Sequence, residues 1–246
     1  MYQELPLSCP SPDAVSFSVD SARRLLLKDV HWGYEEAGVW REVLKGVDLD
    51  VQGGEQIAIL GQSGCGKSSL LHLIGALDQP SAGHIAFGAT DLTGLAEPGR
   101  SLWRRRHVGF IYQFFNLIPT LTVLENVLLP LELNGLRNRE ASAWALDLLS
   151  EVGLAERADA YPDRLSGGEQ QRVAMVRALV HKPDLVLADE PTGNLDLETG
   201  EKVLDILDRL VRAQGHTLLL VTHSIEVAKR AGRIFRLADG KLFPSD

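Results

Sequence analysis

The chain has 246 residues, of which 45% are hydrophobic and 24% charged, and this composition excludes a disordered or fibrous protein. Thirty-three acidic and 25 basic residues give a net charge of −8, which disfavours nucleic acid, so we expect no nucleic-acid partner. The sequence shows no apolar run long enough to span a membrane and no secretory signal, and its two cysteines suit a reducing cytosol.

Predicted strands begin after an opening segment rich in proline and serine. That segment, residues 1–22, has no sustained hydrophobic period, and we expect it to be a poorly ordered extension. Alternating patterns then predict short strands over 25–30 and 41–51. Continuous apolar runs, which are typical of buried parallel strands, follow at 57–60, 185–188 and 217–222.

Helical patterns separate the apolar runs. Apolar residues spaced three and four apart predict helices over 124–133, 139–154, 169–180 and 197–214. The stretch from Asp91 to Arg164 is more helical and more charged than its flanks, which indicates a helical insertion. A dense basic run within it, WRRRH at 103–107, is either solvated surface or a contact with lipid headgroups or a partner acid. Strands that alternate with helices favour an α/β fold with a parallel sheet.

A glycine-rich loop joins the run at 57–60 to an apolar helical segment. Its sequence, GQSGCGKSS, has the G-x-x-x-x-G-K-[ST] spacing at Gly61, Gly66, Lys67 and Ser68. Glycines let successive backbone N–H groups point at one anion, and the start of the following helix adds partial positive charge. Lys67 suits the β- and γ-phosphates and Ser68 suits Mg²⁺. A plain glycine turn is the alternative, but the flanking strand and helix favour a nucleotide site.

Two acids, Asp189 and Glu190, follow the apolar run at 185–188, and Pro191 then stops the strand. Open α/β sheets bind their ligands at this carboxyl end of the strands. An acid there holds Mg²⁺, usually through water, and the next acid can accept a proton from the water that attacks the γ-phosphate. A solvated pair of loop acids is the alternative. The pair favours ATP hydrolysis over simple nucleotide binding.

The segment LSGGEQQR, residues 165–172, precedes an amphipathic helix. Ser166 and Glu169 have the S-x-x-E spacing of a capping box, which by itself only starts a helix. Gly167 and Gly168, however, leave the helix start uncovered by side chains, so a phosphate can approach its N–H groups. Both interpretations stay open on this segment alone.

With these motifs, the chain resembles the ATP-binding subunit of an ABC transporter over about residues 25–245. The motifs occur in that family's order, namely GQSGCGKS, Gln113 in VGFIYQFFN, LSGGEQQR, LVLADE, the D-loop from Asn194 to Asp196, and His223. The resemblance implies an α/β fold, with a P-loop NTPase core on a parallel sheet, an N-terminal antiparallel β-subdomain and an inserted α-helical subdomain. It implies an ABC ATP-binding domain over 23–246, with the helical subdomain at roughly 113–172.

The resemblance also implies a role for each motif residue. Glu190 would be the base, His223 would bond the γ-phosphate, and Gln113 would contact Mg²⁺ and the attacking water. The residues implied to hold the metal are Ser68, Gln113 and Asp189. Those implied to bind ATP are Tyr34, Gly61, Gln62, Ser63, Gly64, Cys65, Gly66, Lys67, Ser68 and Ser69. Those implied to bind the ATP of a second chain are Ser166, Gly167, Gly168 and Glu169, and the D-loop residues are Asn194 and Asp196. Tyr34 would stack on adenine, with Trp32 and Trp40 as neighbouring rivals.

Three segments are similar to the lipoprotein-releasing, macrolide-exporting and cell-division branch of the family, namely VGFIYQFFNLIPTLTVLENV, LADEPTGNLD and AKRAGRIFRLADGKL. This similarity implies ATP and Mg²⁺ as cofactors, a homodimer, and integral membrane permease subunits that contact the region Gln113–Glu132. It implies a peripheral protein at the cytoplasmic face of the inner membrane, whose ATP-driven dimerisation drives release or export of a lipoprotein, peptide or macrolide. Two alternatives stay open: a non-transport ATPase of the same branch that acts on cell-division or cell-wall machinery, and a Gln113–Glu132 region that packs only on its own chain.

Overall fold

The computed structural model describes residues 23–245, so the expectation for residues 1–22 lies outside the described part. The strands are β1 Leu25–Glu36, β2 Val39–Val51, β3 Gln56–Leu60, β4 Ala82–Phe87, β5 Thr90–Asp91, β6 Val108–Ile111, β7 Leu185–Asp189, β8 Thr217–Thr222, β9 Arg233–Ala238 and β10 Lys241–Ser245. The helices are α1 Lys67–Ile74, α2 Gly99–His107, α3 Val123–Leu133, α4 Arg139–Glu151, α5 Gly167–Leu179, α6 Leu197–Gln214 and α7 Ile225–Ala228, with 3₁₀ turns η2 Ala155–Arg157 and η3 Pro162–Arg164. None of the helices in this part has the length and hydropathy that crossing a bilayer requires.

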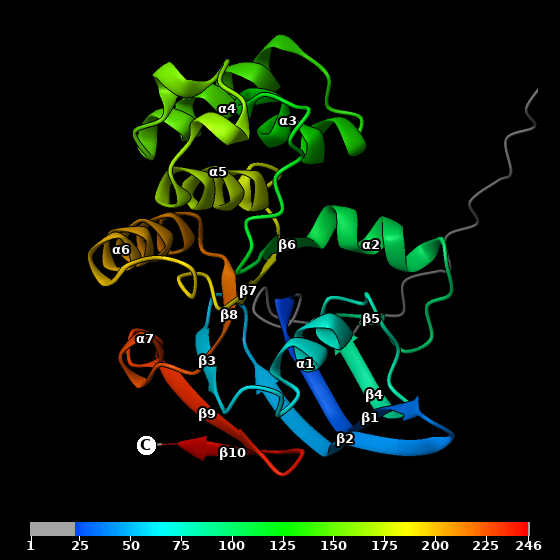
Figure 1. Cartoon of the computed structure of the whole chain (residues 1–246). Coiled ribbons are helices and arrows are strands. Elements are labelled where there is room, and N and C mark those ends of the chain that lie inside the picture. The colour runs from blue at the N-terminus through cyan, green and yellow to red at the C-terminus, as the bar shows by residue number, and fades with distance from the viewer. Residues whose placement is uncertain (1–22, 246) are drawn as a thin grey trace, which may run out of the picture.

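A six-stranded sheet in the order β10-β9-β3-β8-β7-β6 forms the centre of the molecule (Figure 1). The strands from β9 to β6 are parallel, and β10 runs antiparallel to β9 at one edge. Along β7, Leu185 and Leu187 pack into one hydrophobic cluster while Val186 and Ala188 pack into another. Because both faces of the sheet are covered, this strand is a continuous apolar run in the sequence.

One face of the parallel sheet packs against α1 and a second, antiparallel sheet in the order β2-β1-β4-β5. The antiparallel β-subdomain implied by the family resemblance is therefore confirmed. In this antiparallel sheet, β1 and β2 precede the phosphate loop, whereas β4 and β5 follow α1. β4 pairs with β1, and β5 pairs with β4 at the edge. The antiparallel sheet consequently reaches the start of α1 from below (Figure 1).

The opposite face packs against α5 and α6, and α3 and α4 pack on α5 as a further layer (Figure 1). These helices share one hydrophobic cluster with β7 and β8. The predicted helices at 124–133, 139–154, 169–180 and 197–214 are all present, and each starts at a polar N-cap. The caps are Thr122, Asn138, Ser166 and Asp196, whose side chains accept a backbone N–H of the first turn. The α/β fold expected from the sequence is therefore confirmed, because the predicted strands and helices are present.

The interpretation of the whole stretch from Asp91 to Arg164 as a helical insertion is wrong at its start. β6 lies inside that stretch and pairs in parallel with β7 as the edge strand of the central sheet. The strand has only four residues, which is too short for a hydrophobic period to separate it from a helix. The helices α3 and α4 begin after it.

The basic run at 103–107 lies on α2 and is only partly solvated, with Arg105 and Arg106 exposed. Trp103 is buried and packs edge-on against Phe87. Arg104 donates to the carbonyl of Ala76, and Arg105 donates to the carbonyl of Leu133 at 2.7 Å. The run therefore joins α2 to the ends of α1 and α3, rather than forming a fully solvated surface.

Candidate functional site

The carboxyl ends of four parallel strands bring the predicted motifs to one edge of the central sheet. β3 leads into the phosphate loop, β7 ends at Asp189, β8 ends just before His223, and β6 ends two residues before Gln113. The register pairs Leu60, the last residue of β3, with Thr222, the last residue of β8. Loops far apart in the sequence therefore meet at the edge where α/β sheets bind ligands.

The phosphate loop forms an open cradle at the start of α1. The helix begins at Lys67, and Gly66 is its N-cap with a left-handed φ of 102°. Gly64 also has a positive φ, of 79°, which glycine adopts without strain. Because these residues carry no side chain, the N–H groups at the helix start are open to an anion. The ammonium of Lys67 curls back over the loop and donates to the carbonyls of Gly61 and Gln62 at 2.9 and 3.0 Å.

A hollow lies beside this loop. It is lined by the predicted ATP-binding residues Tyr34, Ser63, Gly64, Gly66, Lys67, Ser68 and Ser69, together with Trp32, Val43 and Glu190. The structure therefore brings together residues from β1, the loop, α1 and the end of β7, as the sequence predicts. Cys65 is half-buried, and its Sγ would lie 2.6 Å from a Cβ added at Gly61, so it packs under the loop.

The aromatic residues near this hollow differ in their hydrogen bonds and in how far their side chains are exposed. The indole N–H of Trp32 donates to Asp78 at 3.0 Å, and its ring packs against the hydrophobic core. Tyr34 is 44% exposed and lines the hollow. Trp40 is exposed on β2, opposite Glu35, and does not line it within the described part of the chain. Tyr34 thus lines the hollow with an exposed ring, which packs at a tilt against Trp32 with the ring centroids 6.1 Å apart.

We expect Tyr34→Ala to weaken ATP and ADP to the same degree, by about tenfold, because loss of one aromatic stacking contact on a base costs ~1–3 kcal/mol. Tyr34→Phe should keep the affinity, since stacking needs the ring and not the hydroxyl. Titration calorimetry with each nucleotide measures the effect. Trp40→Ala is the matched control, and a loss of affinity there without one at Tyr34 would move the stacking role to Trp40.

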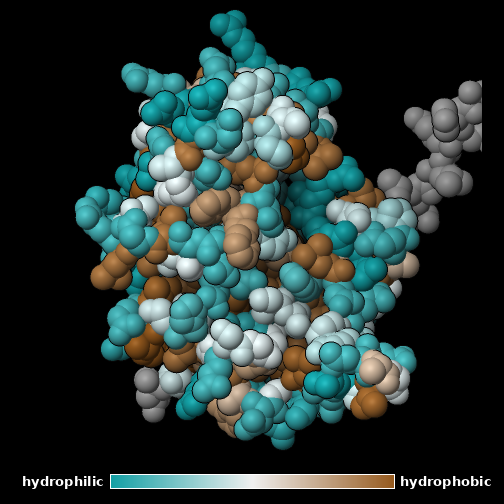
Figure 2. Space-filling view, viewed as in Figure 1, coloured by the Kyte–Doolittle hydropathy of each residue, from teal (hydrophilic) through white to brown (hydrophobic). Residues whose placement is uncertain are grey.

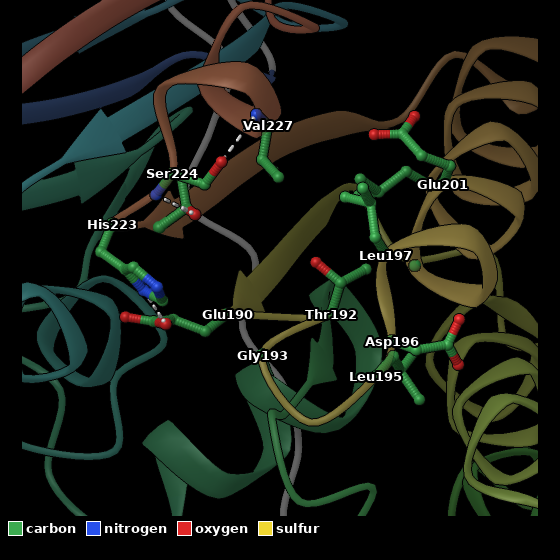
Figure 3. A pocket seen from close by; sticks show the side chains of 13 residues that line it. Glu190, Thr192, Gly193, Leu195, Asp196, Leu197, Glu201, His223, Ser224 and Val227 are labelled. Carbon is green, nitrogen blue, oxygen red and sulfur yellow. Dashed lines mark hydrogen bonds and ion pairs between the residues drawn. The ribbon is translucent and has the colours of Figure 1, made fainter.

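The side chain of Glu190, the predicted general base, lies between the side-chain nitrogens of His223 and Lys67. Glu190 has 15% of its side chain exposed; one carboxylate oxygen lies 2.5 Å from His223 Nδ1 and the other 3.5 Å from Lys67 Nζ. Figure 3 shows the Glu190 and His223 side chains pointing toward one another at one side of a hollow that the turn after β7, the start of α6 and the end of β8 line. Glu190 has a φ of 45°, a left-handed conformation that is uncommon outside glycine. The surrounding fold therefore imposes the direction of this carboxylate.

Gln113 and the D-loop contact each other directly. The Gln113 amide donates to Asn194 Oδ1 at 3.2 Å, and the Asn194 amide donates back to the Gln113 carbonyl at 2.9 Å. A Cβ at Gly193 would lie 2.8 Å from the Gln113 amide nitrogen, so a larger residue there would displace the Gln113 side chain. Asp196 instead caps α6 by accepting the Thr199 N–H at 3.0 Å, which lowers the pKa of Asp196.

The capping-box interpretation of the LSGGEQQR segment is confirmed. The Glu169 carboxylate accepts the backbone N–H and the hydroxyl of Ser166, both at 2.8 Å, and these bonds lower the pKa of Glu169. A Cβ at Gly168 would lie 2.5 Å from Thr199 Cγ2, so the start of α5 packs closely on α6. Among the described residues, those that line the two hollows near Glu190 do not include Ser166, Gly167, Gly168 or Glu169.

The donor set suits a magnesium ion that is bound mainly through nucleotide and water. No three His, Cys, Asp or Glu side chains in residues 23–245 gather into a ready-made ion site. Ser68 lines the hollow beside the phosphate loop, and Asp189 is the last residue of β7, which β8 separates from β3 in the sheet. Mg²⁺ typically takes one or two protein oxygens and completes its shell with phosphates and water, which this site can accommodate.

Sequence analysis missed two polar side chains of α5. Gln171 is fully buried, and its amide donates to the Pro191 carbonyl at 2.5 Å. Arg177 donates to the carbonyls of Phe115 and Asn116 at 2.9 and 2.6 Å, and burial lowers the pKa of its guanidinium. The sequence feature that could have revealed these two residues is their position on the apolar face of a predicted helix.

Comparison with known proteins gives matches that agree on one family of ATP-binding proteins. The ABC transporter family model matches residues 44–193. An uncharacterized ABC transporter ATP-binding protein of Mycobacterium tuberculosis is 50% identical over 89% of this chain and 88% of its own length. The lipoprotein-releasing system ATP-binding protein LolD of Geobacter metallireducens is 47% identical over 89% of this chain and 97% of its own.

Solved structures give the same result. The dimeric structure of MJ0796, a bacterial ABC transporter cassette, has a TM-score of 0.82 and 41% identity, covering 89% of this chain and 96% of that one. A post-hydrolysis state of that cassette bound to ADP and phosphate matches equally well. The fold and the comparisons define a P-loop ATPase of the cassette type. The chain belongs to the ABC transporter family, as an ATP-binding subunit that hydrolyses ATP.

Proposed function

We propose that two copies of this chain close face to face on two Mg-ATP molecules. The observation that carries the proposal is the meeting of Lys67, Glu190 and His223 at the sheet edge, with the signature residues Ser166–Glu169 outside both hollows of their own chain. The dimeric cassette MJ0796 supports this arrangement by similarity. The uncapped N–H groups of Gly167 and Gly168 on each copy then serve the ATP of the other.

The residues of one site divide the chemistry as follows. The loop N–H groups and Lys67 bind the phosphates, and Tyr34 stacks on the base. Ser68, Asp189 and Gln113 hold Mg²⁺, which supplies charge neutralisation on the phosphate oxygens when bound. Glu190 accepts the proton of the attacking water, and His223 orients the carboxylate and the terminal phosphate from the other side.

We further propose that a groove between α2, β6, α3 and α5 receives a short helical foot of an integral membrane subunit. Apolar side chains form most of its lining: Val108, Phe110, Leu129, Pro130 and Leu133. Arg105, Tyr112, Arg177 and His181 supply polar contacts at its margin. Figure 2 shows the surface hollowed between the α3–α4 lobe and α2, with hydrophilic atoms in its depth and hydrophobic atoms at its rim. The groove draws on the predicted region Gln113–Glu132 and extends beyond it to α2 and α5.

The proposed physiological role is release or export of a substrate such as a lipoprotein, peptide or macrolide, with the chain held peripherally at the cytoplasmic face of the inner membrane. The LolD relatives, named for lipoprotein release, support this role at 47–52% identity. Closure of the dimer on ATP moves the two grooves, each with its bound foot, toward one another. Hydrolysis then lets the two chains separate. The work is thereby transmitted to the membrane subunits.

Purification of the tagged chain from detergent-solubilised membranes tests the role. We expect an integral protein with four spans and a large extracytoplasmic domain to co-purify. Leu133→Asp, which places a charge at the apolar rim of the groove, should lose that protein. Leu146→Asp is the matched control, because Leu146 is an exposed leucine of α4 outside the groove lining. Retention of the partner by Leu133→Asp removes the groove from the proposal, and recovery of soluble nucleic acid alone contradicts the membrane role.

A further inference from the structure

Gln171 occupies an unusual position for an amide side chain. It lies on α5, five residues after Ser166, and is completely buried. Its amide nitrogen donates to the carbonyl of Pro191 at 2.5 Å and lies 3.4 Å from the carbonyl of Tyr112. Its amide oxygen finds no partner among the described residues. The amide therefore acts only as a donor, and it does so to two backbone segments of the candidate site.

Both carbonyls adjoin residues of the proposed reaction. Pro191 follows Glu190, and Tyr112 precedes Gln113. The turn after β7 has two internal bonds, from the Gly193 N–H to the Glu190 carbonyl at 2.9 Å and from the Leu195 N–H to the Thr192 carbonyl at 3.1 Å, and Pro191 has no N–H to add another. The Glu190 N–H donates outside the turn, to the Val221 carbonyl of β8 at 3.0 Å. The left-handed conformation of Glu190 thus depends on contacts from outside the turn.

We propose that Gln171 is a positioning residue on α5, the signature helix that the LSGGEQQR segment begins. It holds the Glu190 turn and the start of the loop around Gln113, the Q-loop. The inference rests on the proposed function, because it takes Glu190 as the base. The start of α5 faces the ATP bound by the partner. Through Gln171, the same helix is bonded to the turn that orients Glu190, the general base of its own chain's site. Movement of α5 on closure of the dimer therefore reaches both sites.

Gln171→Met tests the proposal, because methionine has a similar volume and no donor. We expect kcat at saturating ATP to fall by ~10–100-fold, as misplacement of a reacting group does. ADP affinity should stay within twofold, since the phosphate loop is untouched. ATP-driven dimerisation, measured in a Glu190→Gln background, should persist. Hydrogen exchange at the Gly193 amide should become faster than in the unaltered chain.

Trp144→Phe is the matched control. The Trp144 indole donates to the carbonyl of Val180 at 2.9 Å, so this variant also removes one side-chain bond to a carbonyl, at the other end of α5. It should lose some thermal stability and keep kcat within twofold. If Gln171→Met does not fold, Gln171→Leu gives the same test with another apolar side chain of similar size that cannot donate.

A kcat within twofold of the wild type overturns the proposal. A kcat that falls in step with ADP affinity and dimerisation also overturns it, because Gln171 would then be purely structural. Failure of the proposed function has a different signature, namely an unchanged turnover of Glu190→Gln itself.

Discussion

Glu190→Gln is expected to slow ATP hydrolysis by ~10²–10⁴-fold, the usual contribution of a general base. Glutamine keeps the shape of the side chain but cannot take a proton from water. The 2.5 Å contact with His223 and the 3.5 Å approach to Lys67 place the carboxylate beside both groups proposed to bind the terminal phosphate. Loss of its negative charge there also removes repulsion of ATP. The variant should therefore bind ATP and accumulate as a stable dimer.

Phosphate release and light scattering, each with Mg-ATP, measure the two consequences. Glu55→Gln is the matched control, because Glu55 is a glutamate paired with Arg233 at 2.8 Å, outside the lining of the hollow beside the phosphate loop. It should hydrolyse ATP within twofold of the wild type. Wild-type turnover by Glu190→Gln would remove Glu190 from the mechanism, and a chain that stays monomeric at saturating Mg-ATP would remove the dimer.

The sheet edge could be predicted from the sequence because its parts are local signals. β3, β7 and β8 are buried on both faces, so each is a short apolar run, and a proposed site residue follows each run. The N-caps at Thr122, Ser166 and Asp196 likewise depend on side chains within one turn of the helix start. Such features need no knowledge of the tertiary structure.

The choice of the aromatic residue beside the phosphate loop could not be predicted in that way. The pairing of β1 with β2 has register shifts between Leu27 and Val30, Val30 and His31, and Trp32 and Gly33. Each shift changes which side chains face the loop, since side chains alternate along a strand. Trp32 and Tyr34 are two residues apart and share a hollow, yet only Trp32 is bonded to Asp78. Asp78, which lies after α1 and 46 positions from Trp32, determines the difference, and the strand itself does not.

Gln171 shows the same limit for helices. Its polarity predicts an exposed position on an amphipathic helix, whereas the structure buries it completely because two strand ends present carbonyls to that face. Those carbonyls belong to residues 59 and 20 positions away along the chain. A helical period cannot contain that information. Polar residues that interrupt an apolar helix face are therefore useful markers of where a sheet edge meets the helix.

Gly167→Asp is expected to abolish ATP-driven dimerisation and lower hydrolysis by ~10²–10³-fold, the cost of losing a main electrostatic contact to the reacting group. Gly167 begins α5, where the helix presents partial positive charge, and a carboxylate there repels the phosphate of the second chain. ATP affinity of the dilute monomer should stay within twofold, because that nucleotide lies on the chain's own phosphate loop. Sedimentation in the Glu190→Gln background measures dimerisation directly.

The same substitution separates a loss of function from a loss of folding. An acid in the first turn of a helix stabilises it by ~0.3–1 kcal/mol, so the thermal stability of Gly167→Asp should equal or exceed that of the wild type. A Cβ at this position meets Leu195 at 3.4 Å and Phe115 at 3.6 Å, which is ordinary contact. Gly167→Ala therefore controls for bulk and should lose far less activity. If Gly167→Asp still dimerises with ATP, the signature helix does not bind phosphate across the interface, and its glycines serve only the packing of α5 on the D-loop and the Q-loop.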